Sequence, residues 1–297
     1  MSNYFDEKTS FMEPIVTQYG SRMVMTNVVK SKTIKYFNFD TRFSENTDTD
    51  FIFHLPERIT NVTKIKVSQI EIPITFYNIS STLQNNFFLL KNVTTDITIP
   101  IIIDNGNYSQ ESFVLKITSL FLQHNIPITF NINSNNMCSF TNLSTTSSFL
   151  FNFSVNYDGT LCKDYEVNLI QTLFGFKNAT YRLFTQSTII TERCFNINTI
   201  RYLFLSLDDF TNSSHNGFNA MLKKSTVNKQ ILARIPINNN RYPFGSILHG
   251  KLIDCNRIYH GPIDLQKFKI QLINEYGLPI YLNGGSFSFI FEIEIEE

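Results

Sequence analysis

The sequence predicts an all-β protein in which most strands are antiparallel. Many short segments alternate apolar and polar residues, turns rich in Gly, Pro and Asn separate them, and only one or two segments have a helical period. The final segment, 286–297, shows the alternation best. One side of that predicted strand carries only apolar residues: Phe287, Phe289, Phe291, Ile293 and Ile295. The other side is polar apart from Ile290, and it carries Ser286, Ser288, Glu292, Glu294 and Glu296.

The N-terminal segment, 1–33, shows no sustained period. Apolar residues are scattered among polar ones, and Pro14 and Gly20 interrupt the segment. We therefore expect 1–33 to form a loose N-terminal arm, with enough apolar residues to dock on a partner.

Strand patterns begin at residues 33–40 and continue at 50–55 and 62–80. In the third segment the apolar positions change from odd (Ile65, Val67) to even (Ile70, Ile72, Ile74, Phe76). A shift by one residue within a strand predicts a β-bulge, here near Ser68–Gln69. Proline cannot donate to a strand ladder, so Pro73 predicts an edge or the end of the strand.

The middle of the chain contains the helical patterns. Residues 104–125 begin as a turn and continue as a helix with Ser109 at the N-cap and Glu111 in the first turn. A shorter helix is expected within 164–176, capped by Asp164 and ended by Gly175. Strand patterns at 128–133 and 148–156 lie between the two helices.

Strands resume at residues 200–210, where both faces are apolar, so we expect a central strand. Further strands are predicted from 231 onwards, and together with the earlier ones they give about eight strands outside the helical middle. Eight strands in two facing sheets form a jelly roll. We therefore predict a single jelly-roll sandwich from residues 34–84 and 195–297, with a β-rich domain carrying one or two helices inserted at 85–194. The phenylalanine face of the last strand would then close the sandwich core.

Composition excludes several classes of function. The chain has 25 basic and 25 acidic residues, so it lacks the positive charge typical of nucleic-acid-binding proteins. No run of about 18 apolar residues predicts a membrane span, and the N-terminus does not resemble a signal peptide. The four cysteines are widely spaced and are interpreted as reduced core residues: Cys138, Cys162, Cys194 and Cys255.

Motifs for catalysis or cofactor binding are also missing from the sequence, which contains no P-loop, no GxGxxG and no GxSxG. His249 and His260 flank Asp254 and Cys255, but zinc sites need closer pairs. Asp208 and Asp209, followed by His215, are more typical of a solvated loop than of an acid–base pair. We predict a protein that is not an enzyme and that has no catalytic, cofactor or metal site.

The strand series resembles a known family. Residues 51–80 read FIFHLPERITNVTKIKVSQIEIPITFYNIS, which is similar to the opening of the minor capsid (penton) proteins of virophages, Maverick/Polinton-type elements and nucleocytoplasmic large DNA viruses. Further matching segments follow in the expected order: DNGNYSQESF, LFGF, RYLFLSLDDF and the stretch from Gly261 to Ile295. The resemblance covers most of residues 36–297. Its motif positions are turn and core residues, namely Pro73, Phe76, Tyr77, Asn78, Gly261, Pro262, Asn283 and Gly284.

The resemblance implies an upright jelly roll that forms homopentamers at icosahedral vertices, contacts the major capsid protein and resides in the virion after synthesis in the host cytoplasm or a viral factory. Glu292, Glu294 and Glu296 are candidates for contact with a neighbouring subunit, although an acidic strand face also serves simply as a solvated face that blunts edge pairing. Two other functions remain open. One is a cement protein between capsomers; the other is a module that binds a host receptor or glycan through exposed tyrosines such as Tyr242 or Tyr259.

Overall fold

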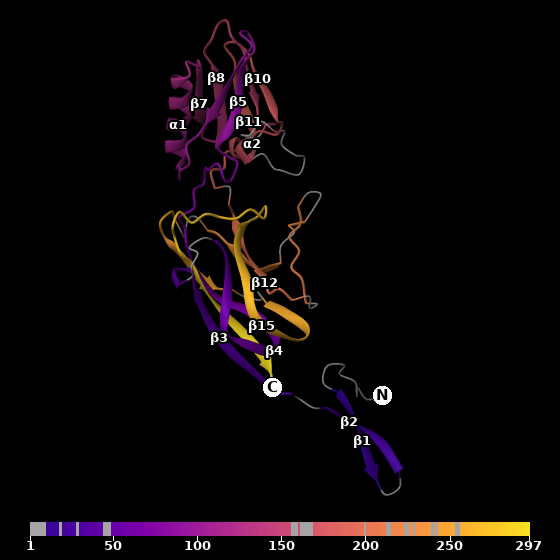
Figure 1. Cartoon of the computed structure of the whole chain (residues 1–297). Coiled ribbons are helices and arrows are strands. Elements are labelled where there is room, and N and C mark those ends of the chain that lie inside the picture. Colours follow the sequence, from indigo (N-terminus) through magenta and orange to yellow (C-terminus); the bar gives the residue numbers. More distant parts are fainter. Residues whose placement is uncertain are drawn as a thin grey trace.

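The computed structural model describes residues 10–17, 20–27, 30–43, 49–155, 160, 169–198, 200–211, 215–222, 226–227, 230–238, 241, 243–252 and 256–297. These residues form three parts along one long axis (Figure 1). A β-sandwich lies in the middle, a second body containing both helices lies at one end, and a hairpin of β1 (Ser10–Thr17) and β2 (Gly20–Asn27) extends from the opposite end. No helix among the described residues is long and apolar enough to cross a membrane.

The sandwich has the strand order of a jelly roll, with all of its pairs antiparallel. Its strands are β3 (Lys32–Asp40), β4 (Asp50–Pro73), β12 (Tyr202–Asp208), β13 (Ile231–Pro236), β14 (Ile247–Lys251), β15 (Asn256–Asn274) and β16 (Ser288–Glu296). Sheet 1 has the order β3, β16, the second half of β4, then β14. Sheet 2 has the order first half of β4, second half of β15, β12, then β13. The predicted eight-stranded jelly roll is therefore confirmed once the two halves of β4 are counted separately.

The two longest strands bend together where they pass between the sheets. In β4 the bend lies near Asn61, whose positive φ falls in the left-handed region that Asn tolerates better than most residues. Its backbone N–H donates to Asp264 Oδ1 at 3.2 Å. In β15 the pairing register shifts between Ile258 and Ile263, so Gly261 and Pro262 of the motif series lie at the matching bend. Gly261 has no side chain to obstruct the bend, and Pro262 has no N–H to leave unpaired, so both residues suit a point where the hydrogen bonds between strands are interrupted.

The predicted bulge is present at Ser68. The β16 partners change from Gln69 to Val67 without a partner for Ser68, whose hydroxyl donates instead to the Ile290 carbonyl at 3.4 Å. This extra residue keeps both Val67 and Ile70 on the buried face. Pro73 is the last residue of β4, as its missing N–H predicted.

The sandwich core is built around phenylalanine rings that pack against one another. Phe39, Phe289 and Phe291 come from the neighbouring strands β3 and β16, and Phe268 reaches them from β15 in the facing sheet. Leu203, Leu205 and Leu207 of β12 fill the same core. The apolar face of the last strand therefore closes the sandwich as expected, and Phe291 and Ile293 have no exposed area.

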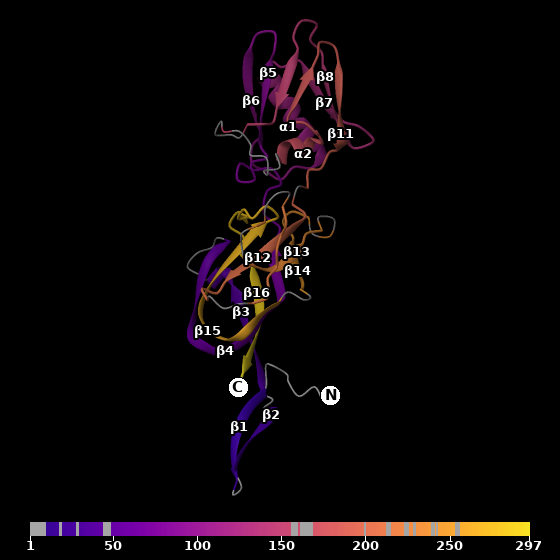
Figure 2. The same ribbon diagram turned by 90° about the vertical axis from the view of Figure 1, so that its right-hand side faces the viewer.

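The second body has a separate core between two small sheets and a helix (Figure 2). Its elements are β5 (Phe87–Asn92), β6 (Ile97–Ile102), α1 (Gln110–Gln123), β7 (Ile128–Ile132), β8 (Met137–Asn142), β9 (Phe149–Asn152), α2 (Leu169–Phe174), β10 (Thr180–Leu183) and β11 (Thr188–Cys194). One sheet has the order β10–β9–β5–β6 and the other β11–β8–β7, with α1 against β7. This body is formed within the connection between β4 and β12. The boundaries predicted at 84/85 and 194/195 stay a proposal.

The start of α1 and the end of α2 are those that the sequence indicated. Ser109 caps α1, and Ser109 and Ser112 bond each other's backbone N–H groups in a capping box. Gly175 follows α2 with a positive φ, a conformation that favours glycine and ends the helix. The expected N-cap of the second helix, Asp164, lies outside the described residues.

A third, small core lies on the outer face of sheet 2. The connection between β12 and β13 carries Val227 over Phe204 and Ile273, side chains that face away from the main core. We call its described residues (209–211, 215–222, 226–227 and 230) the cover segment. Asn216 fixes the segment to β15, because its side-chain oxygen accepts the Ile258 N–H at 2.6 Å.

The N-terminal segment differs from the expectation of a loose arm. β1 and β2 form an antiparallel hairpin from Ser10↔Asn27 to Thr17↔Gly20. The amino-acid pattern carries no clear strand signal here, because the apolar residues do not alternate strictly over either strand. A short η1 turn (Thr41–Phe43) follows β3 and was not predicted either.

Candidate assembly surfaces and the junction between the cores

The acidic face of the last strand is neutralised by lysines of the same chain. Glu294 lies 2.8 Å from Lys32 Nζ, Glu292 3.4 Å from Lys66 Nζ, and Glu296 3.3 Å from Lys30 Nζ. The Lys32 ammonium bond holds the pKa of Glu294 below its usual range, and it raises the pKa of Lys32. The three candidate contact residues thus form one ladder of ion pairs with lysines of β3, of β4 and of the residues just before β3.

Two apolar side chains lie beside this ladder. Tyr36 is directly opposite Glu292 and Ile34 is directly opposite Glu294, so both share the outer face of sheet 1 with the carboxylates. Tyr36 is 65% exposed and Ile34 is 50% exposed. The outer face of sheet 1 therefore combines neutral ion pairs with apolar surface at the β3 margin.

Motif residues after β4 anchor the second body to the sandwich. Asn78 Nδ2 donates to the Tyr108 carbonyl at 2.8 Å, and Asn78 Oδ1 accepts the Tyr108 N–H at 2.9 Å. These two bonds fix the segment that leads into α1. Asn85 Nδ2 donates to the Asn78 carbonyl at 2.7 Å, so the chain is tied at the point where it leaves the sandwich.

The motif between β15 and β16 closes the same junction from the other side. Asn283 Nδ2 donates to the Thr75 carbonyl at 2.6 Å, and the Thr75 hydroxyl donates to the Leu282 carbonyl. Asn283 and Gly284 both have positive φ, which explains an Asn-Gly pair in this turn. The matching sequence motifs therefore meet in space although Thr75 and Asn283 are 208 positions apart.

A cavity of about 240 Å³ opens at this junction. Phe76 and Tyr77 come from the exit of β4, Asn105 comes from the loop before α1, and Tyr281 comes from the β15–β16 loop. All of its lining side chains are uncharged, and the 54% exposed Tyr281 stands at its rim. Aromatic rings and amides around a neutral cavity suit a small, uncharged, hydrogen-bonding ligand.

The expectation that Asp208 and Asp209 lie in a solvated loop is wrong for Asp209. Its carboxylate is buried, lies 2.8 Å from Arg257 Nη1 and accepts the Tyr259 hydroxyl at 2.6 Å. Arg257 also donates to the Leu207 carbonyl at 2.8 Å. Burial raises the pKa of Asp209, but the Tyr259 hydroxyl, the Thr211 N–H and Arg257 together outweigh it and hold the pKa below its usual range.

The tyrosines suggested for glycan binding do not form an exposed platform. Tyr259 is 4% exposed, and burial next to Asp209 raises the pKa of its hydroxyl far above the usual value. Tyr242 lies outside the described residues. The junction cavity, by contrast, is lined by Phe76, Tyr77 and Tyr281, a grouping that the sequence did not indicate because these residues come from separate loops.

Glu275 is a second buried acid, at the end of β15. Its Oε2 makes no hydrogen bond among the described residues, and Arg201 Nε lies 3.6 Å away. Burial raises the pKa of Glu275, and the same carboxylate adds to the burial that raises the pKa of Tyr276 to about 12.

The other residues considered from the sequence are dispersed. His249 lies in β14 and His260 in β15, whereas Asp254 and Cys255 lie outside the described residues, as does Cys162. Cys138 is buried, and burial raises the pKa of its thiol. Cys194 is exposed at the end of β11, so its interpretation as a core residue was wrong. Within the described part of the chain, no group of three or more His, Cys, Asp or Glu side chains could hold a metal ion.

Comparison with known proteins gives two similar solved structures. One is the crystal structure of the selenomethionine-labelled mavirus penton protein, with a TM-score of 0.44, 9% identity and coverage of 90% of this chain and 100% of that chain. The other is the Sputnik virophage by cryo-EM, with a TM-score of 0.41, 12% identity and coverage of 88% of this chain and 97% of that chain. No family model and no curated protein matches the chain. Both similarities extend over most of this chain.

Proposed function

We propose that this protein is a structural subunit of a virus capsid, and specifically the penton that forms homopentamers at the vertices. The observation that carries the proposal is the spatial convergence of the penton-like motifs. Residues 73–78 and 283–284, which resemble the family's motifs, form one hydrogen-bonded junction between the jelly roll and the second body. A fold alone does not identify a function, but a matching motif series that also makes one structural unit is more specific.

The shape of the molecule supports this function. The second body and the β1–β2 hairpin lie at opposite ends of the sandwich, so the flanks of the sandwich are left for lateral contacts (Figures 1 and 2). A ring of upright subunits would point one end outwards and the other towards the shell interior. Through this ring the protein would contact the major capsid protein and reside in the virion.

The solution mass of the full-length protein tests the proposal. One subunit has a mass of 34.5 kDa, so a pentamer has five times that mass. We expect light scattering to approach the pentamer mass as concentration rises, and negative-stain images to show fivefold rings. A monomer at every concentration, or rings of another symmetry, would overturn the penton assignment and favour a cement role between capsomers.

The junction cavity favours a second candidate function, the binding of a host glycan. Its uncharged lining and the exposed ring of Tyr281 suit a neutral monosaccharide unit rather than a charged sugar. Saturation-transfer NMR with neutral and sialylated oligosaccharides tests it. We expect signals from the neutral sugars only, lost in Tyr281→Ala and kept in Tyr36→Ala, a matched control on the far β3 margin. Equal signals in both variants would exclude this cavity.

A further inference from the structure

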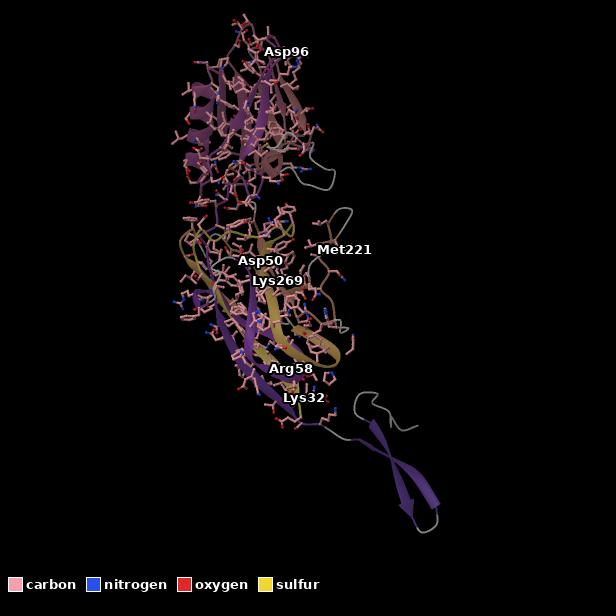
Figure 3. All side chains as sticks on the ribbon, viewed as in Figure 1. Lys32, Asp50, Arg58, Asp96, Met221 and Lys269 are labelled. Atoms are coloured by element: carbon pink, nitrogen blue, oxygen red, sulfur yellow. The ribbon has the colours of Figure 1, made fainter. Side chains whose placement is uncertain are left out.

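The two outer faces of the jelly roll differ in a way that matters for assembly. The outer face of sheet 1 has the paired carboxylates of β16 at its centre and the exposed Ile34 and Tyr36 at the β3 margin. The outer face of sheet 2 carries the cover segment, on which Met221 is 76% exposed and Phe218 is 44% exposed. The two outer faces of a sandwich point in opposite directions. In Figure 1 β3 lies on the left of the sandwich, and in Figure 3, which has the same view, Met221 lies on the right.

The exposed side chains of the cover segment are held in position by the fold. The Phe218 ring packs against the buried Phe204 ring with centroids 5.8 Å apart. Met221 forms an isolated β-bridge with Thr226, and the Val227 N–H donates to the Ala220 carbonyl at 2.9 Å. Two apolar side chains are therefore presented from a segment that is itself anchored on sheet 2, which lowers the entropy cost of binding through them.

A cyclic ring needs two different surfaces of this kind. Head-to-tail contacts join two different surfaces of the same chain, whereas a twofold dimer joins one surface to itself. Here one face is covered with ion pairs and an apolar margin, and the opposite face has projecting apolar side chains. An apolar strand margin and an exposed methionine can fit each other, because methionine adapts its shape to irregular surfaces.

The charges on sheet 1 do not oppose this contact. Glu292, Glu294 and Glu296 each have a lysine partner in the same chain, at 2.8–3.4 Å. An apolar neighbour placed at this margin would cover compensated pairs and would leave no single charge buried. The centres of stable interfaces are depleted of charged residues, so the apolar side chains of the margin would form the centre of the contact and the ion pairs its rim.

We infer that the head-to-tail contact of the ring joins Met221 and Phe218 on the cover segment of one copy to Tyr36 and Ile34 on the β3 margin of the next. The inference rests on the proposed ring-forming function and names the surfaces that build the ring. The acidic residues of β16 would then line the contact as paired neighbours of Tyr36 and would not bridge the two copies.

Single charge insertions test the contact. Met221→Glu and Tyr36→Glu each place an unpaired charge in the proposed interface, so we expect the concentration at which half of the rings dissociate to rise by at least about tenfold. The matched control is Leu115→Glu, because Leu115 is 70% exposed on α1, outside both surfaces. This control should leave the concentration within about twofold. Rings that persist unchanged in Met221→Glu or Tyr36→Glu would overturn the inference and leave the penton function intact.

A combined variant separates a lost contact from a misfolded subunit. Met221→Lys with Tyr36→Glu places opposite charges on the two surfaces, so we expect it to restore rings that each single variant loses. All variants should keep the melting temperature of the wild-type monomer within a few degrees. If the combined variant stays monomeric although it is folded, the two surfaces do not meet.

Cross-linking gives an independent answer within the intact ring. Tyr36→Cys with Met221→Cys, in a chain whose Cys162, Cys194 and Cys255 are serine, should form a ladder of covalent oligomers ending at the pentamer on oxidation. Tyr36→Cys with Leu115→Cys should form none. A wild type that makes no ring at all would overturn the proposed function itself, which this set of variants distinguishes from failure of the inferred contact alone.

Discussion

The two bodies of the molecule handle buried polar groups differently. In the jelly roll several buried polar residues are charged: Asp40, Asp209, Arg257 and Glu275. Within the described residues of 85–194 the buried polar side chains are all uncharged: Asn85, Asn86, Asn142 and Thr191. A buried charge depends on its partner and on pH, whereas a buried amide depends only on hydrogen bonds. The core of the jelly roll should therefore respond to pH and to single charge losses, whereas the core of the second body should not.

The largest expected effect is the loss of the Arg257 guanidinium. Arg257→Met leaves the Asp209 carboxylate buried without its cation, so we expect the jelly roll to be destabilised by about 3–5 kcal/mol. Hydrogen exchange followed by mass spectrometry would show faster exchange in β12, β13 and β15, with the second body unchanged. The control is Arg58→Met, which removes an exposed ion pair with Asp264 and should cost at most about 1 kcal/mol. Equal costs for the two variants would contradict the comparison.

A smaller effect should follow from removing a buried amide in the second body. Asn142 Nδ2 donates to the Ser147 and Phe184 carbonyls at 2.8 and 3.0 Å, and its Oδ1 accepts the Ser144 N–H at 2.9 Å. Asn142→Ala leaves these groups unpaired, at a cost of about 1–3 kcal/mol. Hydrogen exchange should rise only in the second body, and by the same amount under mildly acidic and mildly basic conditions. A loss of protection in β12 or β15 would show that the two cores unfold together.

Replacing Glu275 should stabilise the jelly roll, in contrast to the two losses of stability above, and by an amount that depends on pH. Burial raises its pKa in the folded state, so the stability linked to its protonated form is present at low pH and is lost as pH rises through the raised pKa. Glu275→Gln stays neutral, so at neutral pH we expect it to raise the melting temperature of the jelly roll by about 2–4 °C. The gain should shrink as pH falls towards the ordinary carboxyl range. A gain that does not depend on pH would contradict this interpretation, as would a lower melting temperature at neutral pH.

The smallest effect concerns the surface ladder of the last strand. Glu294→Gln removes the charge that pairs with Lys32, at an expected cost of about 0.2–1 kcal/mol at low salt. Because the pKa of Glu294 is lowered in the folded state, this contribution is present above the ordinary carboxyl pKa and is lost as pH falls through the lowered pKa. Urea unfolding of the variant and the wild type at low and high salt measures it, and high salt should erase the difference.

Local sequence patterns predicted the parts of the fold that local physics decides. The change from odd to even apolar positions located the bulge at Ser68, and Ser109 and Gly175 marked helix ends. The strict alternation of residues 287–295 located the face that closes the core.

Contacts between distant residues could not be predicted in this way. Asp209 and Arg257 are 48 positions apart, and nothing in either neighbourhood marks the pair, so the acid looked like part of a solvated loop. The junction cavity likewise draws Phe76, Asn105 and Tyr281 from three separate loops. The hairpin of β1 and β2 was not predicted because pairing between two weakly patterned strands supplies what neither pattern shows alone.

The position of β16 also determines the order in which the chain can fold. β16 is the last of the eight jelly-roll strands in sequence, yet it lies inside sheet 1, with β3 on one side and β4 on the other. Sheet 1 therefore cannot be assembled until 288–296 have left the ribosome, and β3 has to wait for a partner that is synthesised after every other jelly-roll strand. The second body pairs mostly with neighbours such as β5 with β6 and β7 with β8, so it can fold while synthesis continues. A half-made chain would then carry a finished second body and an open sheet edge, the form of this protein most exposed to mispairing.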